Sequence, residues 1–129
     1  MATTTTPATD LHRAYIAAIN TNETDTILAL LSDDVVYQVP GEAELIGKAA
    51  VAEWASAFFA GYEAQWDKTE HALEVSGDLA VSRYTYTAKF RAREDGAEMG
   101  EVGKGTCVYR RNAAGEWLLM IDSWSTHEP

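Results

Sequence analysis

The second half of this sequence consists of long segments of strand character separated by short turns, and this feature constrains the fold most. The turns are rich in Gly, Asp and Asn, which favour tight reversals, and lie at 76–78, 94–96 and 112–115. They delimit four expected strands, at 65–76, 79–93, 99–111 and 116–126. Because strands joined by short turns lie side by side and run in opposite directions, this half predicts a mostly antiparallel sheet. Long strands twist strongly, so we expect the sheet to curl.

The first half has the periodicity of helices. Apolar residues recur at the spacing of one helix face after Pro7, and a second helix is expected to begin at Thr24 and to end at 32–34. A third helix is expected from 47 to 61. Between the second and third helices, 35–39 is predicted as a strand.

This order of elements predicts an α+β fold. Three N-terminal helices would pack on one face of a strongly curved, mostly antiparallel sheet and leave an internal pocket at its open end. We expect a flexible tail at 1–6 and a single domain at 7–129, because 129 residues make one domain of ordinary size.

Charge and composition exclude several classes of function. The chain has 20 acidic and 10 basic residues, and its net charge of −10 disfavours nucleic acid or an anionic membrane as a partner. No apolar run approaches the roughly 20 residues that cross a bilayer, and the N-terminus lacks the features of a signal peptide. We therefore expect a cytoplasmic protein, which a single cysteine fits. The three histidines lie far apart, so neither a metal ion nor a cofactor is expected.

Six stretches of the chain together resemble the NTF2-like superfamily, and within it the SnoaL-like and ketosteroid-isomerase-like group. They are 15–20, 25–31, 33–37, Gly47–Lys48, 76–81 and 109–122. The resemblance implies a conical α+β fold with an internal pocket and a homodimer that forms through the sheet. It names no reaction, because the superfamily includes isomerases, polyketide cyclases, epoxide hydrolases, dehydratases and binding proteins without catalysis.

Asp122 is the main candidate for acid–base chemistry. Strand alternation places it on one face with Met120 and Trp124, so its carboxyl group is expected in an apolar setting. Withdrawal of a carboxyl group from water disfavours the charged form, which suits a general acid or base. SnoaL-like cyclases are similar in carrying an acidic residue on their last strand. The alternative is a structural pairing of Asp122 with an arginine across the sheet.

Tyr15 resembles the tyrosine with which ketosteroid isomerases stabilise an oxyanion, although a core tyrosine with a satisfied hydroxyl is the alternative. The same resemblance places Val39 at the position of the isomerase base, and valine can remove no proton. Cys107 falls at the position of the second isomerase acid. Isomerisation of steroids by the usual base is therefore not expected.

Arg83 is the expected partner of Asp122, which it would orient. Epoxide hydrolases of this fold are similar in part, but Thr85 stands where they carry an aspartate. Two orientations of the strand at 79–93 are open. Alternation turns Tyr84 and Tyr86 inward and Arg83 outward, whereas the family resemblance turns Arg83 inward and the two tyrosines toward a dimer interface.

The expected lining of the pocket combines five aromatic residues with three smaller ones. They are Tyr37, Trp54, Phe58, Trp66, Trp124, Val39, Cys107 and Met120. Ordinary core packing is the alternative for the aromatic residues.

The leading hypothesis is a cofactor-free enzyme that cyclises, isomerises or dehydrates a small, largely apolar carbonyl compound. Asp122 would move the proton, Tyr15 would donate a hydrogen bond and Arg83 would orient the acid. One alternative is a ligand-binding or accessory dimer without turnover, and another is a purely structural dimerisation module whose pocket is filled by side chains. Gly103 and Gly105 lie within a strand pattern and so form no phosphate loop.

Overall fold

A computed structural model describes residues 7–128. The expected tail at 1–6 lies outside the described residues. The elements follow the chain in this order: a 3₁₀ turn Ala8–Asp10, α1 Leu11–Asn20, α2 Thr24–Leu28, β1 Leu31–Gln38, β2 Leu45–Ile46, α3 Lys48–Gly61, β3 Tyr62–Ser76, β4 Leu79–Ala92, β5 Glu98–Arg111 and β6 Trp117–His127.

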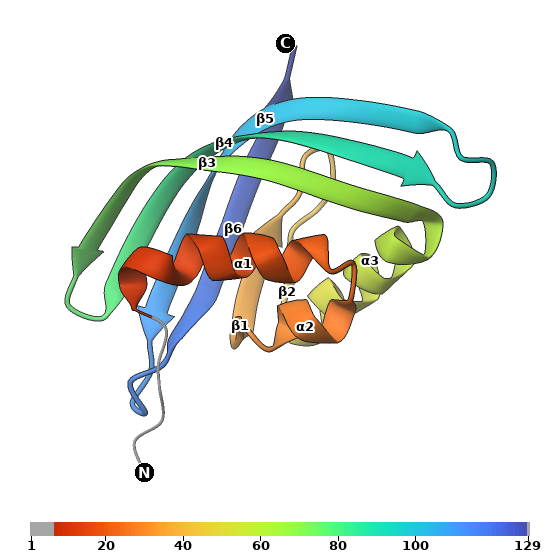
Figure 1. The fold of residues 1–129 in the computed structure, drawn as a ribbon. Helices are drawn as coiled ribbons and strands as arrows, with labels where there is room; N and C mark the ends of the chain where they lie inside the picture. Colours follow the sequence, from red (N-terminus) through yellow and green to blue (C-terminus); the bar gives the residue numbers. More distant parts are fainter. Residues whose placement is uncertain (1–6, 129) are drawn as a thin grey trace.

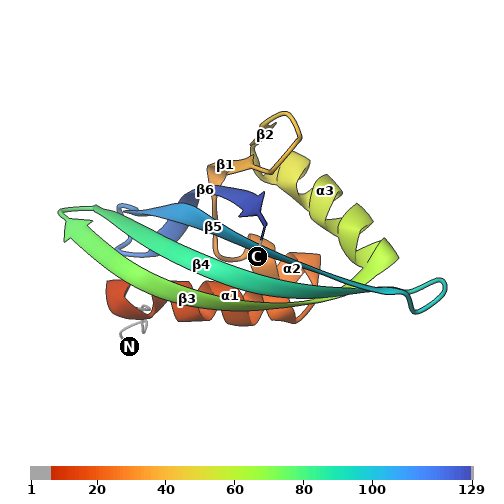
Figure 2. The same ribbon diagram turned by 90° about the horizontal axis from the view of Figure 1, so that it is seen from above.

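The six strands form one sheet in the order β2-β1-β6-β5-β4-β3. Every neighbouring pair is antiparallel except β1 and β6, which run parallel. The sheet curls without closing, and its long strands β3, β4 and β5 arch over α1, with α3 at one end (Figure 1). The view from above shows the same strands crossing α1 and α2 while α3 lies to one side (Figure 2). The predicted α+β fold, with helices on the concave face of a mostly antiparallel sheet, is confirmed.

Strand β4 shows why the curled sheet encloses a core. Its residues alternate strictly between buried and exposed from Leu79 to Lys89, as expected for a strand with one face on the core. Tyr84 and Tyr86 are on the buried face. They meet the apolar stripe of α1, which buries Tyr15 and Ile19. The prediction from alternation alone is therefore correct for β4.

The second helix is shorter than predicted. It ends at Leu28, and the segment predicted to close it belongs instead to β1. Leu31 pairs with Leu119 of β6, and the Leu119 amide donates a hydrogen bond to the carbonyl oxygen of Leu30. Because β1 pairs with β6, the helix ends before all the apolar residues of the predicted helical stripe are included. The edge strand β2 was not predicted either.

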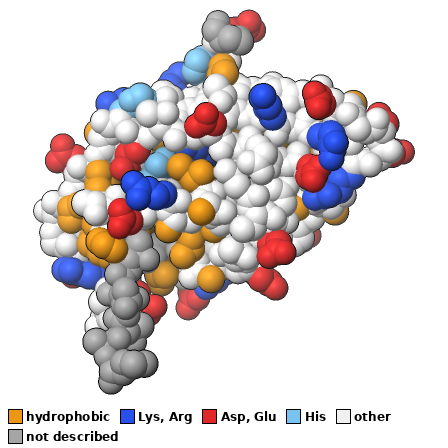
Figure 3. Space-filling model, in the orientation of Figure 1, with side chains coloured by type: hydrophobic (Ala, Val, Ile, Leu, Met, Phe, Trp, Pro, Cys, Tyr) orange, Lys and Arg blue, Asp and Glu red, His pale blue; other side chains and the backbone are white. Residues whose placement is uncertain are grey.

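Acidic and basic side chains are interspersed on the face of the molecule that carries α1 (Figure 3). No helix among residues 7–128 is long and apolar enough to cross a membrane.

Candidate functional site

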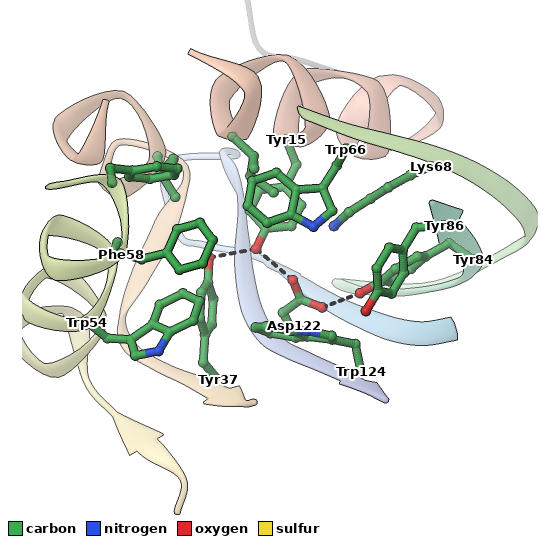
Figure 4. Close-up of a pocket in the computed structure, with 14 residues that line it drawn as sticks. Tyr15, Tyr37, Trp54, Phe58, Trp66, Lys68, Tyr84, Tyr86, Asp122 and Trp124 are labelled. Carbon is green, nitrogen blue, oxygen red and sulfur yellow. Dashed lines mark hydrogen bonds between the residues drawn. The ribbon is translucent and has the colours of Figure 1, made fainter. Parts of the chain in front are cut away.

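A pocket lies between the helices and the concave face of the sheet (Figure 4). Its cavity volume is about 40 Å³, well below the roughly 300–1,000 Å³ of most small-molecule sites. Seven residues predicted from the sequence line it: Tyr15, Tyr37, Trp54, Phe58, Trp66, Asp122 and Trp124. Seven more complete the wall: Ile19, Ile27, Ala55, Phe59, Lys68, Tyr84 and Tyr86. Most of the lining is aromatic or aliphatic.

Asp122 is the buried acid of this pocket, with 2% of its surface exposed. Its Oδ2 atom accepts a hydrogen bond of 2.7 Å from the Tyr15 hydroxyl. Its Oδ1 atom accepts a hydrogen bond of 2.8 Å from the Tyr84 hydroxyl. The same atom accepts a longer hydrogen bond of 3.4 Å from the Cys107 thiol. Three donors thus hold one carboxylate, which compensates for the loss of water around it.

Tyr37 extends this network by one step, since its hydroxyl lies 2.6 Å from that of Tyr15. A phenol has one proton to donate, and Tyr15 directs its proton at Asp122. Tyr37 must therefore donate to Tyr15. All protons of the chain Tyr37, Tyr15, Asp122 point toward the carboxylate, which is the acceptor end of the network.

The phenols in this network are donors and not bases. Burial raises the pKa of Tyr15, Tyr37 and Tyr84 far above the usual value for tyrosine, and the negative charge of Asp122 raises it further. Burial, followed by the charge of Asp122, also raises the pKa of Cys107. These groups stay protonated at neutral pH and act toward Asp122 as hydrogen-bond donors.

Two glycines of β5 allow Tyr84 and Tyr86 to lie flat across the sheet. Tyr84 pairs with Gly105 and Tyr86 with Gly103. A Cβ atom on Gly105 would stand 2.5 Å from Cζ of Tyr84, and one on Gly103 would stand 2.5 Å from Cε1 of Tyr86. Because neither glycine has a side chain, the Tyr84 ring can pass over β5 and reach Asp122 on β6. The tyrosines were not predicted as site residues, although their pairing with strand glycines was a usable signal.

Lys68 is a third residue of the pocket that was not predicted from the sequence. It lies on the inner face of β3 beside Trp66, and both line the pocket. Its Nζ atom is 4.5 Å from the ring centroid of Tyr84 and 5.1 Å from that of Tyr15. Contacts of this kind attract a cation to the faces of the rings. Lys68 therefore places a positive charge above the tyrosines that hold Asp122.

His12 supports Tyr84 from the side of α1. The two ring centroids are 5.3 Å apart, and His12 is buried. Burial lowers the pKa of His12, and the positive charge of Lys68 lowers it further. The imidazole is thus held in its neutral form and packs as a flat side chain against the network.

The prediction that Arg83 faces the pocket is wrong. Arg83 lies on the exposed face of β4, one residue out of phase with Tyr84. On the same outer face, the hydroxyl of Thr85 lies 2.6 Å from Nε2 of His71. Hydrogen bonds from Tyr15, Tyr84 and Cys107 replace the arginine that was expected to orient Asp122.

Three residues predicted to line the pocket do not line it. Met120 falls at a bulge of β6, because Ile121 pairs with Val108 while Leu119 pairs with the next residue of β5. The bulge shifts the alternation, so that Leu119 is buried in place of Met120. Val39 packs against the core beyond the end of β1.

Cys107 is the third of these residues. It is fully buried and contacts Asp122, to which it contributes its thiol.

Among residues 7–128, no group of three or more His, Cys, Asp or Glu side chains could hold a metal ion.

A curled six-stranded sheet with helices on its concave face places the protein in the class of NTF2-like α+β folds. Within that class the chain belongs to the SnoaL-like family, because the family model for the SnoaL-like domain matches residues 12–120. No curated protein sequence matches the chain.

Solved structures share this fold. A ketosteroid isomerase-like protein from Erwinia carotovora atroseptica is 21% identical, with a TM-score of 0.86 over 95% of each chain. A conserved protein from Planctomyces limnophilus is 21% identical, with a TM-score of 0.83 over 92% of each chain. A candidate dehydratase of the NTF2-like family from Streptomyces avermitilis is 22% identical, with a TM-score of 0.80 over 95% of this chain and 100% of that one. At such identities the likeness concerns the fold alone.

Proposed function

We propose that the pocket binds a small, largely apolar carbonyl compound and that Asp122 transfers a proton on it without a cofactor. The reaction would be a cyclisation, an isomerisation or a dehydration. The observation that carries the proposal is a carboxylate that is 2% exposed, lines an aromatic pocket and is the convergence point of phenol donors. A base at the wall of an apolar pocket can meet a C–H bond that water does not reach.

The hydrogen bonds of Asp122 leave one of its oxygen atoms free for this step. Oδ1 accepts from both Tyr84 and Cys107, whereas Oδ2 accepts from Tyr15 alone. A carboxylate oxygen has two lone-pair positions, so Oδ2 retains one. Oδ2 is therefore the atom that we assign to receive the proton of the substrate, while Tyr84 fixes the other oxygen.

This arrangement differs from the one implied by the resemblance to ketosteroid isomerases. Val39, at the position of their base, is partly buried and packs against the core. Tyr15 donates its proton to Asp122, so it has none left for a substrate oxyanion while that bond is intact. We accordingly assign the base to β6 and treat Tyr15 as the residue that positions it.

A second function, ligand binding without turnover, is favoured by one specific observation. Both oxygen atoms of Asp122 accept hydrogen bonds from side chains of the protein itself, as a purely structural buried acid would require. A binding protein would use the same aromatic walls and leave the carboxylate untouched.

Native mass spectrometry and extraction of ligands from freshly purified protein separate the two functions. We expect the Asp122→Asn variant to retain a carbonyl compound that the wild type converts and releases, because the amide cannot take up a proton. The Asp67→Asn variant is the matched control, since Asp67 is exposed on the outer face of β3. A compound held equally by all three proteins would support binding without turnover. An Asp122→Asn variant that retains no carbonyl compound would contradict the proposal.

A further inference from the structure

Two hydrogen-bond donors of the pocket are not used by the protein itself. Tyr86 is only 4% exposed, and its buried hydroxyl has no hydrogen-bond partner among the described residues. The ammonium group of Lys68 has no carboxylate within ion-pairing distance in residues 7–128. A buried hydroxyl without a partner is rare, because leaving it unpaired costs free energy. A ligand that supplies an acceptor would remove that cost.

Lys68 and Tyr86 start from neighbouring positions on the wall of the pocket. They are direct cross-strand partners on β3 and β4, and both line the pocket. Cβ atoms of such partners are about 4.5–5.5 Å apart when the side chains share a face. Lys68 extends from β3 toward the space between Tyr15 and Tyr84, close to Asp122 (Figure 4).

Both groups can donate hydrogen bonds to a ligand at neutral pH. An ammonium group has three N–H donors and no lone pair. Burial raises the pKa of Tyr86, and the negative charge of Glu101 raises it further, so its hydroxyl keeps its proton. The part of the ligand that meets them must therefore carry an acceptor oxygen, whereas the surrounding aromatic walls suit its apolar part.

The charges of the pocket favour a neutral ligand that becomes negative during the reaction. Before the reaction the pocket contains the negative Asp122 and the positive Lys68. An anionic ligand would add a second negative charge to this apolar site, where an unpaired charge is costly. A neutral carbonyl compound that gives a proton to Asp122 leaves the net charge unchanged, because the negative charge moves from the carboxylate to the ligand oxygen.

We propose that Lys68 and Tyr86 bind the carbonyl oxygen of an enolisable ketone or aldehyde and stabilise the enolate formed from it, an inference that rests on the proposed function of Asp122. The C–H bond next to the carbonyl breaks, and its proton joins Oδ2 of Asp122. Its electron pair forms the C=C bond of the enolate, while the carbonyl oxygen takes the negative charge. The N–H of Lys68 and the O–H of Tyr86 donate to that oxygen, as in an oxyanion hole.

A pair of probes that differ by one oxygen atom tests this assignment directly. The dissociation constant Kd is measured for 2-acetylnaphthalene, which has a carbonyl oxygen, and for 2-ethylnaphthalene, which lacks it. The ratio of the two Kd values isolates what the oxygen contributes to binding. We expect the ratio to favour the ketone in the wild type, to shrink about tenfold or more in Lys68→Met, and to shrink about threefold in Tyr86→Phe. Lys89→Met is the matched control, because Lys89 lies on the exposed face of β4.

The infrared C=O stretching frequency of the bound ketone supplies a readout that a merely structural role would not move. It should be lowered in the wild type by the hydrogen bonds and should rise toward its value in apolar solvent in Lys68→Met and in Tyr86→Phe. The inference is overturned if the wild type binds both probes equally or binds neither, or if the Lys68→Met and Tyr86→Phe ratios equal that of the wild type.

The same measurements on Asp122→Asn keep this inference separate from the proposed function. We expect the lowered C=O frequency to persist in that variant, because the donors to the oxygen are still present. A lowered frequency without any proton transfer in the wild type would refute the role of Asp122 and retain the oxygen site. Proton transfer by Asp122 with an unshifted C=O frequency would refute the oxygen site and retain the role of Asp122.

Discussion

The Gly105→Ala variant should be much less stable than the wild type and should lose the hydrogen bond between Tyr84 and Asp122. An added Cβ atom would stand 2.5 Å from Cζ of Tyr84 and 2.7 Å from the backbone oxygen of Ser123. The second contact is with the neighbouring strand, which cannot move without breaking the ladder between β5 and β6. Overpacking at a rigid site costs roughly 1–3 kcal/mol and more where the backbone must shift, so we expect a loss of about 3 kcal/mol.

Urea unfolding followed by circular dichroism measures this loss. Gly61→Ala is the control, because a Cβ atom on Gly61 meets nothing within 4 Å. If Gly105→Ala is as stable as Gly61→Ala, then Tyr84 does not lie across β5 as described. Displacement of Tyr84 also removes a donor to Asp122, so the variant should bind ligands of the pocket more weakly even where it is folded.

Alkaline pH should unfold the protein in a single steep transition. Burial is the first cause of the raised pKa of five tyrosines: Tyr15, Tyr37, Tyr84, Tyr86 and Tyr109. In the unfolded chain these phenols lose their protons near pH 10, whereas in the folded protein they keep them. The unfolded state therefore binds fewer protons above about pH 10, and stability falls as pH rises.

The expected slope is large because the five groups act together. Each group contributes up to about 1.4 kcal/mol per pH unit, so the free energy of unfolding falls by as much as about 7 kcal/mol per unit above pH 10. A domain of ordinary stability is thus unfolded within one to two pH units. Below the unfolded-state pKa of tyrosine, this contribution to stability is fully present. Cys107, whose ordinary pKa is lower, adds to the loss from about pH 9.

Near-ultraviolet absorbance of tyrosinate and far-ultraviolet circular dichroism, recorded on the same samples, test this expectation. The two signals should change in one coincident transition. Tyr86→Phe, which removes one buried phenol, should make the transition less steep. Ionisation of most tyrosines near pH 10 in a protein that keeps its circular dichroism would contradict the buried network.

The four long strands of the second half and the third helix were predictable because their signals are local. Turn residues at 76–78, 94–96 and 112–115 mark the hairpins, and the third helix is observed from Lys48, next to the predicted start. The second helix was misjudged because its end depends on pairing between β1 and β6, whose paired residues are 85 or more positions apart in the chain. A stripe of apolar residues does not reveal that distant partner.

The site was predictable where alternation and residue type agreed. Asp122, Tyr15 and five aromatic residues were placed in the pocket correctly. Arg83 was misplaced because a family resemblance was set against an uninterrupted alternation, and the alternation was right. Met120 was misplaced because a bulge in β6 leaves no mark in the sequence.

Lys68 was overlooked for a different physical reason. A lysine in a strand is ordinarily solvated, and nothing local indicates that α1 covers this one. Its inward position depends on being in phase with Trp66 and on the tyrosine rings beneath its ammonium group. Such a contact arises only when α1, β3 and β4 are assembled.

The most direct test of proton transfer by Asp122 is deuterium incorporation next to the carbonyl of 2-acetylnaphthalene in heavy water, followed by NMR. We expect the wild type and Asp67→Asn to accelerate the exchange equally. In Asp122→Asn the exchange should fall to its rate in buffer. Positioned acid–base groups contribute roughly a hundredfold to ten-thousandfold, so the difference is well within reach of the method. Exchange at the same rate in the wild type and in Asp122→Asn, with the ketone bound to both, would contradict proton transfer by Asp122.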